Sequence, residues 1–156
     1  MLKISIICLG KYKEDAYKKL EAEYKKRLSV YGKFNIIELQ EEPYSKSADI
    51  EKIKLKEAEK IKKYLNNNSI VILLEEKGVM RDSIDFAKYI DRLSSLGQEI
   101  TFVLGSGVGL HESLKEVSNH TISLSALTFP HNLARILLLE QLYRAGTIIS
   151  GKEYHK

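Results

Sequence analysis

The sequence predicts an α/β domain with a mainly parallel sheet flanked by helices. Strand-like segments alternate with segments at helical spacing along the 156 residues, which is the pattern of β-α-β units. The run Ile70–Leu74 is apolar at every position, as expected for a parallel strand that is covered on both faces. No repeat or linker divides the chain, so we expect residues 1–156 to form a single domain.

The first elements are a strand, a helix and a second strand. Leu2–Leu9 is rich in β-branched and apolar residues, which indicates a strand. A helix is expected from about Glu14 to Leu28, because apolar residues recur there at helical spacing. Phe34–Leu39 has the composition of a second strand.

A long basic helix and a buried strand follow a polar loop, Gln40–Lys46. Apolar residues keep helical spacing over residues 50–65, and a row of asparagines ends this helix. Ile70–Leu74 is the third strand. Ser83 is a suitable cap for the next helix, whose apolar stripe runs to Leu93.

The last third of the sequence has the pattern of two strands on either side of a glycine-rich segment, followed by a long helix. Ile100–Leu104 is a buried strand that leads directly into residues 105–109 (GSGVG). A short helix over His111–Ser118 and a short strand over Thr121–Leu124 follow. Residues 131–145 are helical with apolar residues on several sides, where a subunit interface could account for part of the burial.

This topology predicts where a ligand binds. In an open parallel sheet, ligands bind beyond the carboxyl ends of the strands. Three loops lie there, after Leu74, after Leu104 and after Leu124. The last loop, Ser125–Pro130, carries small residues and hydroxyls before a helix begins, and its backbone amides suit an anion or the edge of a heteroaromatic ring.

Common catalytic and nucleotide-binding motifs are absent. The glycines of 105–109 lack the spacing of a dinucleotide fingerprint, and the sequence has no Gly-Lys-Ser/Thr of a Walker loop. The four histidines and Cys8 lack zinc-ligand spacing, so we expect no metal site. Gly105-Ser106-Gly107 is not the nucleophile elbow of a hydrolase. The glycines fit either a plain turn or a close approach of the backbone to a ligand.

Charge and cysteine content bear on partners and location. The first 65 residues hold 16 basic and 11 acidic residues, whereas the rest hold 9 and 10. A polyanion such as RNA would explain this surplus, although lysines interleaved with glutamates also fit solvated helix faces. One cysteine cannot form an internal disulfide, and no apolar run approaches the roughly 20 residues that span a bilayer. We therefore expect a cytoplasmic protein that does not enter the membrane.

The C-terminal third carries further functional candidates. Arg135 and Arg144 lie about two and a half turns apart on the predicted helix, on opposite faces, so we expect them to have different roles. The chain closes with residues 151–156 (GKEYHK), which by themselves would be a frayed tail.

Several segments resemble the ribosomal RNA large subunit methyltransferase H family, a branch of the SPOUT superfamily. The resemblance is most specific in Leu-Thr-Phe-Pro-His, in Tyr-Arg-Ala and in the terminal Tyr-His, and it extends over nearly the whole chain. The segments that carry it are Gly10-Lys11, Glu23-Tyr24 to Arg27, Ala48-Asp49-Ile50, Leu74-Glu75, the glycine loop, Ser123–His131, Glu140–Ala145 and Tyr154-His155.

The resemblance implies a methyltransferase that uses S-adenosylmethionine to methylate N3 of a pseudouridine in 23S rRNA on the assembled 70S ribosome. It also implies a C-terminal trefoil knot, which periodicity would not predict because threaded chains are nearly absent from folds, and a homodimer. Carried over by position, the cofactor-binding residues are Leu74, Gly105, Leu124, Ser125, Ala126, Leu127, Thr128 and Phe129.

The catalytic candidates are Arg144, Tyr154 and His155. The N3 proton must leave, and the negative charge then spreads over two flanking carbonyl oxygens. We expect Arg144 to stabilise that charge, His155 to act as the base, and Tyr154 to stack on or orient the uracil ring. The tail of one subunit would complete the site of the other.

Two positions depart from the family pattern. Ser106 stands in place of the second of two adjacent glycines, and Lys77-Gly78-Val79 reverses the usual Gly-Lys order. These changes concern the shapes of two loops. Two other functions remain as alternatives: a Rossmann-like nucleotide-dependent oxidoreductase, which the glycine spacing disfavours, and a non-catalytic module that binds RNA or the ribosome.

Overall fold

The computed structural model describes the backbone of residues 1–155 and the side chains of residues 1–154. Five strands form one sheet in the order β2-β1-β4-β3-β5, and every neighbouring pair is parallel. This confirms the α/β class and the parallel sheet. The strands are β1 (Leu2–Leu9), β2 (Gly32–Leu39), β3 (Ile70–Met80), β4 (Ile100–Leu104) and β5 (His120–Ser123).

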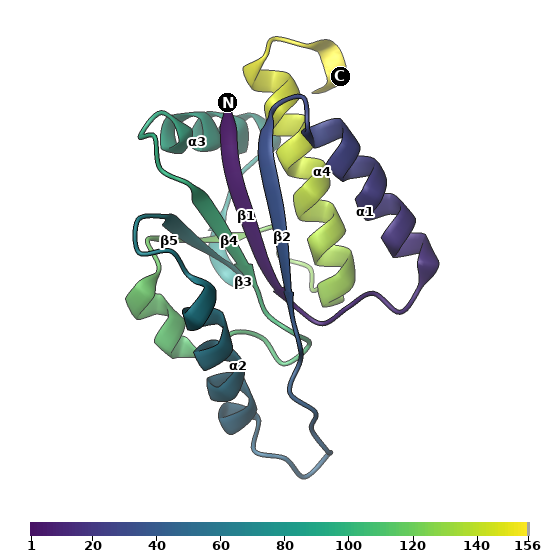
Figure 1. Ribbon diagram of the computed structural model, residues 1–156, viewed down its shortest axis with the longest axis vertical. Helices are drawn as coiled ribbons and strands as arrows, with labels where there is room; N and C mark the ends of the chain where they lie inside the picture. Colours follow the sequence, from purple (N-terminus) through teal and green to yellow (C-terminus); the bar gives the residue numbers. More distant parts are fainter. Residues whose placement is uncertain (156) are drawn as a thin grey trace.

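Helices cover both faces of the sheet (Figure 1). The helices are α1 (Asp15–Leu28), α2 (Ile50–Tyr64), α3 (Ser83–Ser94) and α4 (His131–Ile149), with short 3₁₀ helices η1 (Glu112–Val117) and η2 (Glu153–His155). Successive residues of the central strands face opposite ways, so Ile6 and Phe102 pack with α1, α3 and α4, whereas Ile7 and Val103 pack with α2 and η1. Because the central strands are buried on both faces, their sequences are apolar at successive positions.

β3 is longer than the sequence predicts, because an excursion interrupts it. Leu74 and Val79 both pair with Ile122 of β5, so the residues between them bulge out of the sheet. A Cβ on Gly78 would lie 2.4 Å from the carbonyl carbon of Ile122, and only glycine permits this approach. The glycine at position 78 therefore has a local structural reason.

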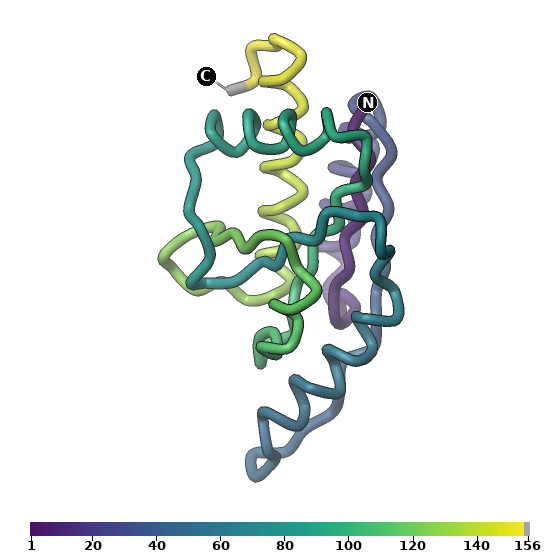
Figure 2. Tube along the Cα trace, turned by 90° about the vertical axis from the view of Figure 1, so that its left-hand side faces the viewer, coloured from purple at the N-terminus to yellow at the C-terminus, as the bar shows by residue number. Residues whose placement is uncertain are grey.

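α3 and α4 differ from their predicted ends. The cap of α3 is Asp82 rather than Ser83, since the Asp82 carboxylate accepts a hydrogen bond from the Asp85 amide at 2.7 Å. The Ser83 hydroxyl instead donates to Gln141 of α4 at 2.8 Å and joins the two helices. α4 continues past Ala145 to Ile149, and α3 lies across it (Figure 2).

Arg135 fixes α4 against two neighbouring elements. Its side chain is 3% exposed, and its Nη atoms lie 2.6 Å from Glu21 Oε2 of α1 and 2.9 Å from Glu38 Oε2 of β2. The guanidinium also lies over the Tyr12 ring, 4.3 Å from its centroid. Cys8 is buried beside this group, and burial raises the pKa of its thiol to about 12. Arg135 thus has a structural role in the helix.

Replacement of Arg135 is expected to destabilise the fold strongly. Arg135→Met would leave the carboxylates of Glu21 and Glu38 without their buried cation, and we expect a loss of about 3–5 kcal/mol in the free energy of unfolding. Guanidinium denaturation at one fixed protein concentration measures it. The control, Lys88→Met on the exposed face of α3, should change stability by about 0.5 kcal/mol or less. Equal stabilities of the two variants would contradict a buried role for Arg135.

Candidate active site

A cavity of about 740 Å³ opens at the carboxyl ends of β3, β4 and β5, where the sequence predicts a ligand site. This volume lies within the range of small-molecule sites. Seven of the eight predicted cofactor-binding residues line the cavity, and Ala126 is the exception. The seven are Leu74, Gly105, Leu124, Ser125, Leu127, Thr128 and Phe129.

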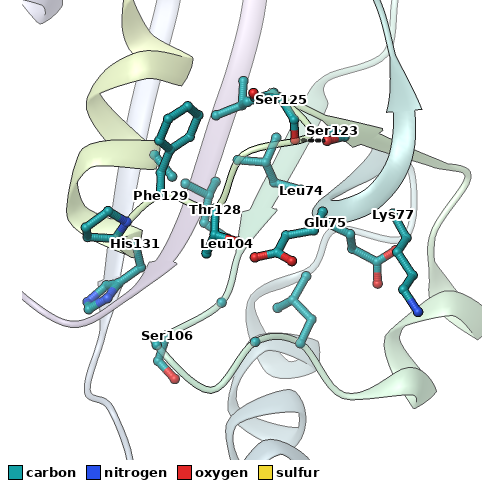
Figure 3. A pocket seen from close by; sticks show the side chains of 18 of the residues that line it. Leu74, Glu75, Lys77, Leu104, Ser106, Ser123, Ser125, Thr128, Phe129 and His131 are labelled. Carbon is teal, nitrogen blue, oxygen red and sulfur yellow. Dashed lines mark hydrogen bonds between the residues drawn. The ribbon is translucent and has the colours of Figure 1, made fainter.

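Three loops form the walls of the cavity (Figure 3). Phe129 and His131, from the segment that leads into α4, lie on one side, while Glu75 and Lys77 of the β3 excursion lie on the other. The glycine loop lies between them. The walls combine apolar side chains with carboxylates and ammonium groups, because Glu75, Glu76, Lys77 and Lys115 join the leucines in the lining.

The loop after β5 has a defined shape. The Ser123 hydroxyl donates to the Ser125 carbonyl at 2.8 Å, and the Leu127 amide donates to the Ser125 hydroxyl at 3.0 Å. These bonds form a serine turn that presents the backbone of the loop to the cavity. His131 begins α4 at this point, and its Nε2 lies 3.5 Å from Glu41 Oε1. The loop is therefore held at both ends.

The glycine loop is anchored from α2. Ser106 is buried, and its hydroxyl donates to Glu57 Oε1 at 2.7 Å. A Cβ on Gly105 would lie 2.9 Å from the carbonyl carbon of Gly109, so the loop folds tightly on itself. Burial raises the pKa of the Glu57 carboxyl, and the hydrogen bond from Ser106 opposes that rise. Ser106, where the family pattern has glycine, thus serves as a link between the loop and α2.

Sequence analysis missed Glu57. The spacing of the sequence could have identified it, because Glu57 falls four residues after Ile53 and four before Ile61 and so lies on the buried stripe of α2. A carboxylate on an apolar stripe requires a partner, and the hydroxyl at position 106 provides one.

The catalytic candidates lie at the other end of α4. Arg144 Nη2 lies 2.5 Å from Glu140 Oε1, and the guanidinium lies over the Tyr154 ring, 4.9 Å from its centroid. Tyr154 also packs edge-on against Tyr143, with centroids 4.8 Å apart. The tail is thus docked through Tyr154 rather than frayed. The side chain of His155 lies outside the described residues.

One chain does not bring the catalytic candidates to its own cavity. Arg144 follows His131 by thirteen helical residues, which at 1.5 Å each separates them by about 20 Å along the axis. Figure 2 shows the cavity loops at one end of α4 and the C-terminal turn at the other. Arg135, near the beginning of the helix, has a different environment from Arg144, as its spacing predicts.

The described residues contain no cluster of His, Cys, Asp and Glu that could hold a metal ion. Within the same part of the chain, no helix is both long and apolar enough to cross a bilayer.

Comparison with known proteins gives a consistent result. A family model described as a predicted SPOUT methyltransferase matches residues 2–155. The chain is 45% identical to the ribosomal RNA large subunit methyltransferase H of Caldicellulosiruptor saccharolyticus, over 98% of this chain and 99% of that protein. It is 42% identical to the protein of that name in Desulforamulus reducens, over 100% of both chains. It is also 46% identical to a putative ribosomal RNA large subunit methyltransferase H of Methanococcus vannielii, over 99% and 100%.

The Glu57 carboxyl makes the stability of the fold depend on pH. Its pKa is higher in the folded state than the ordinary value of 4.5, so the folded chain binds more protons and the free energy of unfolding falls as pH rises above about 4.5. Glu57→Gln keeps an acceptor for Ser106 but removes the ionisation. We expect the stability of this variant relative to the wild type to increase with pH.

Urea denaturation between about pH 4 and pH 8 tests this expectation. The exposed neighbour provides the control, because Glu59→Gln changes the same charge on α2 without a buried carboxyl. If Glu57→Gln and the wild type followed parallel curves, the raised pKa of Glu57 would be wrong.

Proposed function

The chain belongs to the SPOUT methyltransferase family, and we propose that it transfers a methyl group from S-adenosylmethionine to N3 of a pseudouridine in 23S rRNA of the assembled 70S ribosome. The observation that carries this proposal is the similarity along the full chain to proteins named for rRNA methylation, joined to a cavity of suitable size at the carboxyl edge of the sheet. The same similarity favours a methyltransferase over the oxidoreductase and the non-catalytic binding module. The proposal treats residues 1–156 as one domain that acts in the cytoplasm, with no membrane partner.

The residues of the cavity fit S-adenosylmethionine. When bound, this cofactor supplies an electrophilic methyl group on a positively charged sulfonium. Glu75 and Glu76 match its cationic groups and Lys77 or Lys115 its carboxylate, while Gly105 permits the tight turn that places the glycine loop in the cavity wall. The backbone of Leu124–Phe129, including Ala126, would hold the adenine, with Leu74 and Gly105 around the ribose and methionine.

The proposed active site is shared between two subunits. Arg144 and Tyr154 lie a helix length from the cavity of their own chain, so a homodimer that apposes the two ends would complete each site. In that site Arg144 would stabilise the negative charge of the deprotonated ring, Tyr154 would orient the ring, and His155 would accept the N3 proton.

We also propose that the chain forms the C-terminal trefoil knot that the resemblance to the family implies. The connection from β4 to β5 crosses β3, and the chain then returns past the cavity to form α4 between α1 and α3. Such a return brings the loops after β3, β4 and β5 together around one cavity.

Methyl transfer to ribosomes tests the function directly. Incubation of the protein with S-adenosylmethionine and 70S ribosomes that lack the modification should methylate a single pseudouridine, as measured by mass spectrometry of the rRNA nucleosides. We expect Arg144→Ala to lower the single-turnover rate about 10²-fold or more. The control, Arg92→Ala on α3, should leave the rate unchanged. Absence of transfer by the wild type would overturn the proposal.

A mixing experiment tests the shared site. Gly105→Val should distort the loop that lines the cavity, because a Cβ there meets the Gly109 backbone at 2.9 Å, whereas Arg144→Ala should disable the other half. Neither variant alone should methylate ribosomes. After exchange of subunits, half the dimers are mixed and each has one intact site, so about a quarter of the wild-type activity should return. A mixture that stays inactive would mean that each subunit uses its own Arg144.

A further inference from the structure

We propose that α1 adds a nucleotide-binding surface to the active site, formed by Tyr24 and Arg27 beside Tyr143 and Tyr154. This inference rests on the proposed function and extends it, because the ligand is an unpaired nucleotide of the rRNA that lies next to the methylated one. Tyr24 and Arg27 do not line the cavity, and the resemblance to the family gives neither of them a role.

Tyr143 is the centre of a cluster of aromatic rings. Its ring centroid lies 6.4 Å from that of Tyr24, 5.9 Å from that of Tyr31 and 4.8 Å from that of Tyr154. The rings come from α1, the turn before β2, α4 and η2, so the cluster joins α1 to the C-terminal tail. We call these four residues the tyrosine cluster, and all four are partly exposed.

Arg27 extends this cluster into solvent. Its guanidinium carbon lies 5.8 Å from the Tyr24 centroid and 5.7 Å from that of Tyr143, although its side chain is 42% exposed. Its Nε donates to Glu23 at 2.7 Å, which holds the side chain in place. A guanidinium has four further N–H groups that suit phosphate or base oxygens.

The surface adjoins the catalytic candidates. Arg144 lies over the Tyr154 ring, and the Tyr154 hydroxyl is 3.5 Å from Glu140 Oε1. The Tyr143 ring joins Tyr24 to this group, since its centroid lies 6.4 Å from that of Tyr24 and 4.8 Å from that of Tyr154. Tyr24, Tyr154 and Arg144 therefore border one region at the end of α4.

The chemistry of this region fits RNA better than other ligands. Unpaired RNA bases stack on aromatic rings and on guanidinium planes, and the adjacent phosphates attract basic side chains. The last turn of α1 supplies Lys25 and Lys26 beside Arg27. An enzyme that acts on one base takes it out of the stack, and partly exposed rings beside Arg144, the proposed catalytic residue, would hold an unpaired neighbour of that base.

Equilibrium binding to 70S ribosomes that lack the modification tests the surface. We expect Tyr24→Ala to bind about tenfold more weakly, through the loss of a stacked ring, and Tyr24→Phe to bind like the wild type. Arg27→Gln should also weaken binding and should lower the slope of log affinity against log salt concentration by about one. Tyr64→Ala and Lys88→Gln make matched changes at exposed positions outside the tyrosine cluster and should leave binding unchanged.

Two further measurements distinguish a role of Tyr24 and Arg27 in RNA binding from a role in the packing of the fold. The melting temperature and the affinity for S-adenosylmethionine should stay close to wild-type values in Arg27→Gln, because the side chain is 42% exposed and its ion pair with Glu23 lies on the surface. If Tyr24→Ala fails to fold, Arg27→Gln decides the question.

Unchanged ribosome affinity in Arg27→Gln and Tyr24→Ala, with methyl transfer by the wild type intact, would overturn this inference alone. Weaker binding of Arg27→Gln with an unchanged salt slope would indicate contact with a ribosomal protein and would overturn the RNA assignment. Failure of the wild type to methylate ribosomes would instead overturn the proposed function.

Discussion

All five strands of the sheet run in the same direction, and this constraint determines where the functional groups can lie. The carboxyl ends of β3, β4 and β5 meet at one edge, so the loops that follow them enclose one cavity. α4 must begin at that edge because it follows the loop after β5, and its 19 residues carry the chain to the far side. The distance between the cavity and Arg144 is thus a consequence of strand direction and helix length.

α4 needs polar contacts to fix its rotation, because apolar residues cover it on several sides and would pack in more than one orientation. Arg135 supplies one such contact through its carboxylate partners on α1 and β2. Gln141 supplies another through the Ser83 hydroxyl of α3. These contacts bind two different sides of the helix to separate elements. A buried ion pair adds little net stability, but loss of one partner is costly, so the contacts of Arg135 favour the rotation of the helix in which this side chain faces Glu21 and Glu38.

The elements that the sequence predicted well are those with a local signal. β1 and β4 have the predicted bounds, because apolar composition alone defines a strand that is buried on both faces. The excursion in β3 was missed, since a pattern of side chains does not reveal that Leu74 and Val79 share one partner. Glu57 was also missed, because its partner Ser106 lies 49 residues away in the sequence. The parallel sheet predicted that the loops after Leu74, Leu104 and Leu124 lie around a ligand site, and the resemblance to a family assigned a cofactor to that site.

The contacts of Arg144 with Glu140 and Tyr154 explain why this arginine is paired with a carboxylate although its proposed task is to bind negative charge. A free arginine side chain has about 2 kcal/mol of rotamer entropy to lose on binding. Glu140 and the Tyr154 ring hold the guanidinium in one position before substrate arrives, so most of that cost is met during folding. Nη2 and Nε face Glu140, which leaves other N–H groups of the same fork to meet charge on the uracil oxygens. The pairing therefore orients the cation without consuming its hydrogen-bonding capacity.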